Sequence, residues 1–296
     1  MDFKQLESFV TIAKLNSFSK AADKLFLTQP TISNHILSLE KELDTVLFNR
    51  TNKKITLTHS GEILYEYAVS ILNKRDSAFF SLNQFKGKIE GILEIASSTI
   101  PEQYYLTEIL TKFHISYPDV KFDLKKYDTK QVLDKINLGE IDFGIVGAEK
   151  DIRNIEFIPI FDDEIVLIAP NRPPYDKMDT ISFENVLKHP LIIREKGSGT
   201  RQRFQNEVEA HNYEIEDLNC VGEIESNETI KKMVSRGLGL SFVSNRSIQN
   251  ELKLGQLKII DVKDFQMKRN FYFVFHQKRA LSPLARTFRD FILSMH

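Results

Sequence analysis

Residues 19–42 form two predicted amphipathic helices joined by Phe26-Leu27, and this pattern constrains the chain more than any other. The second helix has a clear predicted start. The hydroxyl of Thr28 can accept hydrogen bonds from free backbone N–H groups, and Pro30 fits the first helical turn because no donor is needed there. Apolar residues at near-helical spacing are expected to face the core, and they are Ile32, Ile36, Leu39 and Leu43.

The opposite side of this second helix carries short, polar and mostly uncharged side chains. They are Gln29, Thr31, Ser33, Asn34, His35 and Ser38. A helix in the major groove of DNA needs such donors and acceptors close to its backbone, where they can reach base edges and phosphates. An ordinary solvated face is the alternative, but such faces are usually rich in Lys and Glu, and the first charge in this helix is Glu40. The pattern therefore favours DNA contact.

A third helix is predicted upstream of these two. Its apolar stripe follows the helical period and consists of Leu6, Phe9, Val10 and Ala13. Ser19 can then cap the helix that follows. Three helices within about forty residues predict a compact helix-turn-helix core.

A basic hairpin is predicted after the helices, within residues 44–58, as two short extended segments around a turn. Arg50, Lys53 and Lys54 lie at or beside this turn. In such a wing they would contact DNA phosphates, which makes binding depend on salt without specifying sequence. Three cations alone would indicate a solvated turn, but beside the preceding helices they indicate a DNA-binding wing.

A long helix is predicted from about residue 58 to residue 85, and at 1.5 Å per residue it would span roughly 42 Å. Its apolar seam alternates steps of four and three, with one polar interruption, as in a coiled coil. The seam consists of Leu64, Ala68, Ile71, Arg75, Ala78, Leu82 and Phe85. We expect this helix to pair with a second copy of the chain, which would place two recognition helices on successive DNA half-sites.

The first sixty residues resemble the N-terminal region of LysR-type transcriptional regulators. The motifs that carry the resemblance are Ser19-Lys-Ala-Ala-Asp-Lys-Leu25, Thr28-Gln-Pro-Thr-Ile-Ser33, Leu39-Glu-Lys-Glu-Leu43, Leu47-Phe-Asn-Arg50 and Leu57-Thr-His-Ser-Gly61. This chain departs from the family at the wing, where Asn52-Lys53-Lys54 replaces an Arg-rich segment, which affects phosphate affinity more than fold. The predicted DNA-contacting residues are Ser19, Thr28, Gln29, Pro30, Thr31, Ser33, Asn34, Arg50, Lys53 and Lys54.

A different pattern follows the short hinge at residues 87–91. Strand-like segments alternate with helical ones to the end of the chain, which predicts parallel α/β sheets. The pattern breaks near residues 162–163 and again near 265–268, so we expect two sheets in two lobes. The resemblance agrees, because the effector domains of LysR-type regulators are similar to two-lobed, type 2 periplasmic binding proteins with the ligand in the cleft.

The fold class predicted for the chain is thus α/β, with a winged helix-turn-helix at 1–58 and a linker helix with hinge at 59–90. The effector-binding domain follows at 91–296, with one lobe at 91–162 and 268–296 and the other at 163–267. Here an effector is the small molecule that controls a regulator.

The effector site is predicted from the ends of strands, where ligands of open α/β sheets bind near helix N-termini. In one lobe the strand ends offer hydroxyls and a small residue. In the other, a Gly-Ser-Gly-Thr loop flanked by Lys196 and Arg201 suggests an anion cradle. Helix capping and a tight turn are the alternatives. Together with the resemblance, the pattern implies effector contacts at Ser98, Thr99, Thr129, Gly147, Ser198, Gly199 and Thr200.

Composition excludes several other classes. The net charge of −1 means that DNA binding depends on local placement of charge. The single cysteine, Cys220, excludes a disulfide framework and a thiolate metal cluster. No signal peptide and no membrane-spanning apolar run is present, which favours a cytoplasmic protein without membrane contact. No catalytic motif is found, so no catalytic residue, cofactor or metal ligand is predicted.

The sequence therefore predicts a sequence-specific transcription regulator that binds double-stranded DNA as a homodimer or homotetramer. A small anionic metabolite would shift the population of cleft geometries. The segments 97–105 and 194–201 look most like the branch of the family concerned with sulfur and cysteine metabolism, which implies a sulfate-like oxyanion or an acetylated amino acid. The alternatives are a solute-binding module without a DNA role and, with least support, an α/β enzyme.

Overall fold

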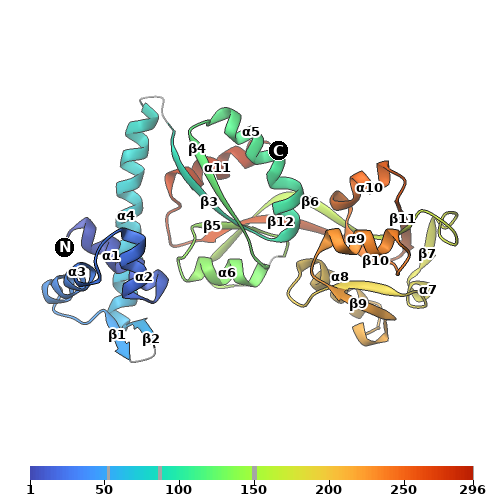
Figure 1. The fold of residues 1–296 in the computed structure, drawn as a ribbon, viewed down its shortest axis with the longest axis horizontal. Coiled ribbons are helices and arrows are strands. Elements are labelled where there is room, and N and C mark those ends of the chain that lie inside the picture. Colours follow the sequence, from blue (N-terminus) through green and yellow to red (C-terminus); the bar gives the residue numbers. More distant parts are fainter. Residues whose placement is uncertain (52–53, 86–88, 149–151, 296) are drawn as a thin grey trace.

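The computed structural model of the chain describes all residues except 52–53, 86–88, 149–151 and 296. Figure 1 shows an elongated molecule with a helical head at one end, two α/β lobes at the other, and a long helix between the head and the first lobe. Both lobes are threaded by the same two long strands, β6 and β12.

The head contains α1 (Phe3–Leu15), α2 (Phe18–Leu25), α3 (Gln29–Glu42) and an antiparallel hairpin of β1 (Phe48–Thr51) and β2 (Lys54–Leu57). The predicted start of α3 is confirmed, because the Thr28 hydroxyl accepts a hydrogen bond from the Thr31 N–H at 3.3 Å and Pro30 lies in the first turn. The expected cap of α2 was wrong by two residues. Ser17 caps it, since the helix begins at Phe18 and already includes Ser19.

The core of the head lies between α1, α2, α3 and the start of the linker helix. Ile32, Ile36 and Leu39 are fully buried in it, as predicted. Leu43, the residue that ends α3, is 38% exposed, so its predicted burial was wrong. His35 also differs, since its Nδ1 is 2.7 Å from Ser8 Oγ on α1 and its ring therefore turns toward the neighbouring helix.

The linker helix α4 (His59–Phe85) uses part of its predicted seam within its own chain. Leu64, Ala68 and Ile71 pack against the core of the head. Arg75 donates to Glu7 Oε1 at 2.6 Å, so the polar interruption of the seam is also taken up by the head. The expected seam was wrong for this half, because a helix docked on its own head cannot offer the same face to a second copy. The side chain of Phe85 lies outside the described part.

Large apolar side chains elsewhere on α4 face outward. They are Ile63, Tyr67, Phe79 and Leu82, each more than half exposed. Of these four, only Leu82 belongs to the predicted seam.

The first lobe is built on parallel strands in the order β4-β3-β5, with β12 antiparallel to β5. A short π-helical turn at 101–105 leads into the first of three covering helices. The elements of this lobe are β3 (Gly91–Ser97), α5 (Leu106–Ser116), β4 (Val120–Lys126), α6 (Thr129–Asn137), β5 (Phe143–Val146), β12 (Met267–His276) and α11 (Pro283–Leu293).

The second lobe contains the far half of β6 (Ile155–Pro170), to which β10 and β11 pair antiparallel. A parallel pair, β8 and β9, lies beside it. The other elements of this lobe are β7 (Thr180–Ser182), α7 (Phe183–Val186), β8 (Leu191–Arg194), α8 (Gly199–Ala210), β9 (Cys220–Ile224), α9 (Asn227–Ser235), β10 (Ser241–Ser244), α10 (Gln249–Lys253) and β11 (Leu257–Lys263).

The expectation of two separate parallel sheets was wrong. The β6 strand continues through Asp162 and Asp163, where the sequence suggested a break, and pairs antiparallel with β12 from one lobe into the other. Asp163 does not interrupt the strand because it is buried and forms an ion pair with Arg269 on β12. One mixed sheet therefore runs through both lobes in the described residues.

The linker helix also contacts the first lobe. The Tyr65 hydroxyl donates to the carbonyl oxygens of Leu138 at 3.1 Å and Gly139 at 3.3 Å, just past the end of α6. Arg279 donates to the last carbonyls of the same helix, and its guanidinium lies 5.8 Å from the centre of the Tyr65 ring. Burial raises the pKa of Tyr65 to about 12, so the hydroxyl keeps its proton at neutral pH. The two ends of α6 thus adjoin different sites, since Thr129 begins it at the pocket described below.

Candidate functional sites

One candidate site is the exposed face formed by the start of α2 and by α3. Ser19, Gln29 and Asn34 are exposed on it, and Ser33 is half-buried. The Ser19 hydroxyl donates to Gln29 Oε1 at 3.2 Å, which joins the start of α2 to the first residue of α3. The predicted residues on this face are Ser19, Thr28, Gln29, Pro30, Thr31, Ser33 and Asn34, and none of them belongs to the buried core.

In the wing, the structure describes the backbone pairing of the hairpin but not the side chains of its basic residues. Arg50 pairs with Ile55 across the hairpin, and Lys54 pairs with Thr51. Lys53 lies outside the described residues, as do the side chains of Arg50 and Lys54. The two strands therefore bring the backbone of Arg50 and Lys54 to the same end of the hairpin.

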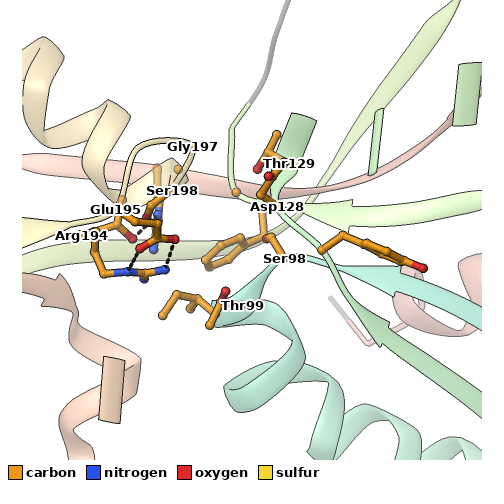
Figure 2. Close-up of a pocket in the computed structure, with 15 residues that line it drawn as sticks. Ser98, Thr99, Asp128, Thr129, Arg194, Glu195, Gly197 and Ser198 are labelled. Carbon is orange, nitrogen blue, oxygen red and sulfur yellow. Dashed lines mark hydrogen bonds and ion pairs between the residues drawn. The ribbon is translucent and has the colours of Figure 1, made fainter. Parts of the chain in front are cut away.

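The second candidate site is a small pocket between the two lobes, with a cavity volume of about 30 Å³. Figure 2 shows Ser98, Asp128 and Thr129 of the first lobe across from Arg194, Glu195 and Ser198 of the second. Every predicted effector-contacting residue lines this pocket: Ser98, Thr99, Thr129, Gly147, Ser198, Gly199 and Thr200.

The first lobe presents a strand end and a helix N-terminus to the pocket. Ser98 directly follows β3, and its N–H donates to the Ile145 carbonyl at 2.8 Å. Thr129 is the first residue of α6, whose cap, Asp128, accepts from the Gln131 N–H at 2.7 Å. Free N–H groups at such a helix start favour an anion.

Close contact with Phe271 explains the glycine at position 147. A Cβ atom built on Gly147 would lie 2.6 Å from the Phe271 ring, too close for any other residue without a shift of the ring. Across the pocket, a Cβ on Gly199 would lie 3.6 Å from the Gly147 carbonyl oxygen and 3.8 Å from Thr129 Oγ1. The two lobes therefore approach each other closely at Gly147 and Gly199.

The second lobe presents the start of α8. The Ser198 side chain caps this helix by accepting from the Arg201 N–H at 3.5 Å. Gly197 adopts a φ of +100°, which favours glycine. Thr200 is only 3% exposed, and its hydroxyl accepts from Arg269 Nη1 at 3.1 Å.

Arg269 contributes a buried positive charge to the pocket. Its Nε and Nη2 donate to Asp163 Oδ2 at 2.8 and 2.7 Å. Its guanidinium also lies 4.7 Å from the centre of the Phe271 ring. Burial lowers the pKa of Arg269, and the neighbouring Asp163 carboxylate opposes that shift. Arginine remains protonated under such conditions, so the pocket keeps a cationic wall.

Arg194 is the second buried cation. Its Nε and Nη2 donate to the two carboxylate oxygens of Glu195 at 2.8 and 2.9 Å, and its Nη1 donates to Asn227 Oδ1 at 2.8 Å. Arg194 is 4% exposed, whereas the side chain of Glu195 is 27% exposed. The carboxylate that neutralises Arg194 is therefore the partner nearer to solvent.

The source of charge differs from the sequence prediction. Lys196 is exposed and does not line the pocket. Arg201 points away, since its Nη1 donates to Glu223 Oε2 at 2.6 Å. Arg194 and Arg269 supply the charge in their place. A signal for Arg269 was present in the sequence. It lies two residues from each of the apolar Met267 and Phe271, so its side chain lies on the same, inward face of the strand.

Other chemistry has little support in the described residues. No group of three or more His, Cys, Asp or Glu side chains there could hold a metal ion. None of the described helices is both long and apolar enough to cross a bilayer. Cys220 is exposed and forms no disulfide within the described residues.

Two known protein families match the two parts of this chain. The family described as "LysR substrate binding domain" matches residues 86–296, and "Bacterial regulatory helix-turn-helix protein, lysR family" matches residues 3–62. The chain belongs to the LysR family. It is thus a DNA-binding transcription regulator in which a helix-turn-helix head precedes a two-lobed α/β effector domain.

Relatives within the LysR family cover nearly the whole chain. An uncharacterised HTH-type transcriptional regulator of Methanocaldococcus jannaschii is 36% identical over 287 residues, which are 97% of this chain and 96% of the relative. The transcriptional activator CmpR of Synechocystis is 31% identical over 290 residues, or 98% of this chain and 94% of that protein. Both relatives are described as transcription regulators.

Solved LysR-family structures have the same fold. Full-length OxyR of Pseudomonas aeruginosa aligns over 100% of this chain and 94% of its own, with a TM-score of 0.76 and 21% identity. The regulatory domain of Synechocystis CcmR in complex with 2-PG aligns with a TM-score of 0.64 and 28% identity, over 70% of this chain and 97% of that domain.

Proposed function

We propose that this LysR-family regulator binds duplex DNA through the α2–α3 face and the wing, under the control of a small anionic metabolite held between the lobes. The observation that carries the proposal is the pair of guanidinium groups with buried side chains, Arg194 and Arg269, in a pocket that both lobes line. DNA contact is assigned to the ten predicted residues of the head, and effector contact to the seven predicted residues of the pocket.

The proposed boundaries are those expected from the sequence: 1–58 for the head, 59–90 for the linker helix and hinge, and 91–296 for the effector domain. Within the latter, residues 91–162 and 268–296 form one lobe and 163–267 the other. Separate hydrophobic cores support the division, one in the head, two in the first lobe and two in the second.

An anion suits the pocket because of how Arg194 is paired. The Glu195 carboxylate accepts hydrogen bonds from Nε and Nη2 of Arg194, the two donors that could bind a ligand's carboxylate side by side. An anionic ligand would therefore compete with Glu195 for Arg194. A planar carboxylate or a sulfate-like oxyanion can replace those two hydrogen bonds, whereas a neutral ligand would leave the guanidinium without them. The starts of α6 and α8 add N–H groups that favour negative charge.

The proposed control is a shift between lobe arrangements. A ligand that touches Thr129 in one lobe and Arg194 in the other stabilises the arrangement in which both contacts form. The same free-energy difference then changes DNA affinity, because two linked equilibria affect each other equally.

We propose a homodimer or homotetramer assembled through the outward apolar residues of α4. Ile63, Tyr67, Phe79 and Leu82 support this because each is a large apolar side chain more than half exposed on α4. Pairing there would place two α3 helices on successive half-sites of DNA. We propose that the regulator acts in the cytoplasm. The proposal includes no cofactor and no catalytic residue.

The ligand class is narrowed by screening. Sulfate-like oxyanions and acetylated amino acids stay the first candidates, and 2-PG joins them because it was solved with the related CcmR domain. We expect one of these to raise the melting temperature of the full chain, since a ligand at 100 times its Kd stabilises by about 2.7 kcal/mol. It should also change the affinity for duplex DNA.

Matched variants test the site. Arg194→Met should abolish the thermal shift, while Lys196→Met, a cation outside the pocket, should keep it. A shift by uncharged ligands alone, or an equal shift in Arg194→Met, would contradict the anionic effector. Loss of DNA binding on removal of residues 1–58 tests the head, and binding that survives this removal would contradict the assignment.

A further inference from the structure

Phe26 combines two unusual features in the turn between α2 and α3. It is 94% exposed, the highest value among the exposed large apolar side chains of the described residues. It also ends α2 with a φ of 54° and a ψ of 40°, in the left-handed region. Its N–H donates to the Ala22 and Asp23 carbonyls, so the turn needs this backbone conformation.

Left-handed backbone is unfavourable for a bulky side chain, and Asn and Asp tolerate it best after glycine. The rest of this chain follows that rule. Besides Phe26, the described non-glycine residues with positive φ are Asn16, Asp44, Asn154, Asn212 and Asp264. Asn16 even has the same role, because it ends α1 with a φ of 49°. An asparagine at position 26 would therefore serve the fold better than phenylalanine does.

The position of Phe26 suggests what the ring is for. It precedes Thr28 by two residues and Gln29 by three, so it adjoins the proposed DNA-contacting face. We propose that Phe26 is itself a DNA-contacting residue, and that its ring packs against the methyl group of a thymine in the major groove. This inference rests on the proposed DNA-binding function and adds a residue to it.

Thymine is the base that such a ring can recognise. In the major groove it differs from cytosine by its C5 methyl group, which apolar side chains such as Phe contact. Pro30 and the methyl groups of Thr28 and Thr31 are the other apolar groups among the predicted contacts, so the test below must couple one thymine to Phe26 itself. A contact with a second copy of the chain has less support, because Phe26 and Leu27, which is 39% exposed, form a patch far smaller than a stable protein interface.

The experiment uses the full chain and duplexes that the wild-type protein selects from a random pool. Each thymine of the best duplex is replaced in turn by uracil, which removes only the methyl group. We expect one replacement to weaken wild-type binding about fourfold, since one buried methyl contributes roughly 0.8 kcal/mol. Phe26→Asn should bind the unmodified duplex about tenfold more weakly and should lose its sensitivity to that same uracil.

Folding controls accompany these measurements. Phe26→Asn should melt at the same or a higher temperature than wild type, because it relieves the backbone, and Phe26→Tyr should keep DNA affinity. Leu254→Asn removes a side chain that is 70% exposed in the second lobe and should leave DNA binding unchanged.

Three sets of results would overturn the assignment. Equal affinity of Phe26→Asn and wild type, or an equal loss on every duplex without coupling to any uracil, would exclude thymine recognition while leaving the proposed function intact. A changed oligomeric state of Phe26→Asn in sedimentation would assign the ring to a second copy instead. Failure of the wild type to select any duplex would overturn the proposed function, and this inference with it.

Discussion

The DNA-contacting face and the effector pocket use hydroxyl and amide side chains in opposite environments. On the head, Gln29 and Asn34 are exposed to solvent and no charge lies among them. In the pocket, Thr200 is 3% exposed and accepts a hydrogen bond from a buried arginine. The same chemistry is thus solvated in one region and held within a charge network in the other.

This difference predicts that single substitutions have larger effects in the pocket than on the head. A buried charge that loses its partner keeps its full desolvation cost, whereas an exposed group that loses a partner is solvated by water. We therefore expect the pocket to respond strongly to the removal of one group, and the head to respond through modest contributions from several residues.

The largest effect should follow the loss of Asp163. Asp163→Asn leaves Arg269 buried without a carboxylate and should lower the free energy of unfolding by about 3–5 kcal/mol. Ser244→Ala is the matched control, because it removes only the hydroxyl that donates to Asp163 Oδ1 at 2.7 Å, and should cost about 1–2 kcal/mol. Urea denaturation of both variants measures the difference. A cost below that of Ser244→Ala would contradict the pairing.

Glu195 should oppose the effector. Glu195→Gln removes the carboxylate that competes for Arg194, so anion affinity should rise by about 1.5–3 kcal/mol, the usual range for a hydrogen bond to a charged group. Glu223→Gln is the control, since Glu223 pairs with Arg201 outside the pocket. Calorimetric titration with the ligand found by screening tests both. Weaker binding by Glu195→Gln would show that Glu195 supports the ligand.

On the head, each groove contact should matter less. Ser33→Ala and Asn34→Ala should relax base preference at individual positions, at about 1–3 kcal/mol each, while keeping the rest of the site. Thr111→Ala, which alters an exposed residue of α5 in the first lobe, serves as the control. Selection from a random duplex pool measures the preference. Unchanged preference in both variants would exclude this part of α3 from base contact.

The smallest expected difference between the two regions is the salt dependence of their binding affinities. DNA affinity should fall steeply with salt, and Lys53→Ala or Lys54→Ala should each reduce the slope of log K against log salt by about 1, for all sequences alike. Effector affinity should change little, because screening acts weakly on buried charges. Titrations at several salt concentrations test this contrast, and equal salt dependence at the two sites would remove it.

Local patterns predicted most of the elements and many site residues. The start of α3 follows from Thr28 and Pro30, since capping involves neighbours in sequence. The residues at strand ends were also predicted, because parallel strands bring their carboxyl ends to one edge of a sheet. The outward apolar residues of α4 were predicted only in part, because docking of this helix on its own head decides which side chains stay exposed.

What the sequence alone determined is the set of features that depend on neighbours: helix periods, caps, polar faces and the order of elements. Tertiary structure decided the continuous β6–β12 pair and the charges of the pocket. Arg269 lies 106 positions from Asp163 in the chain, yet the two residues share one ion pair. Each charge offsets much of the cost of burying the other, so neither position can be interpreted until the strands are brought together.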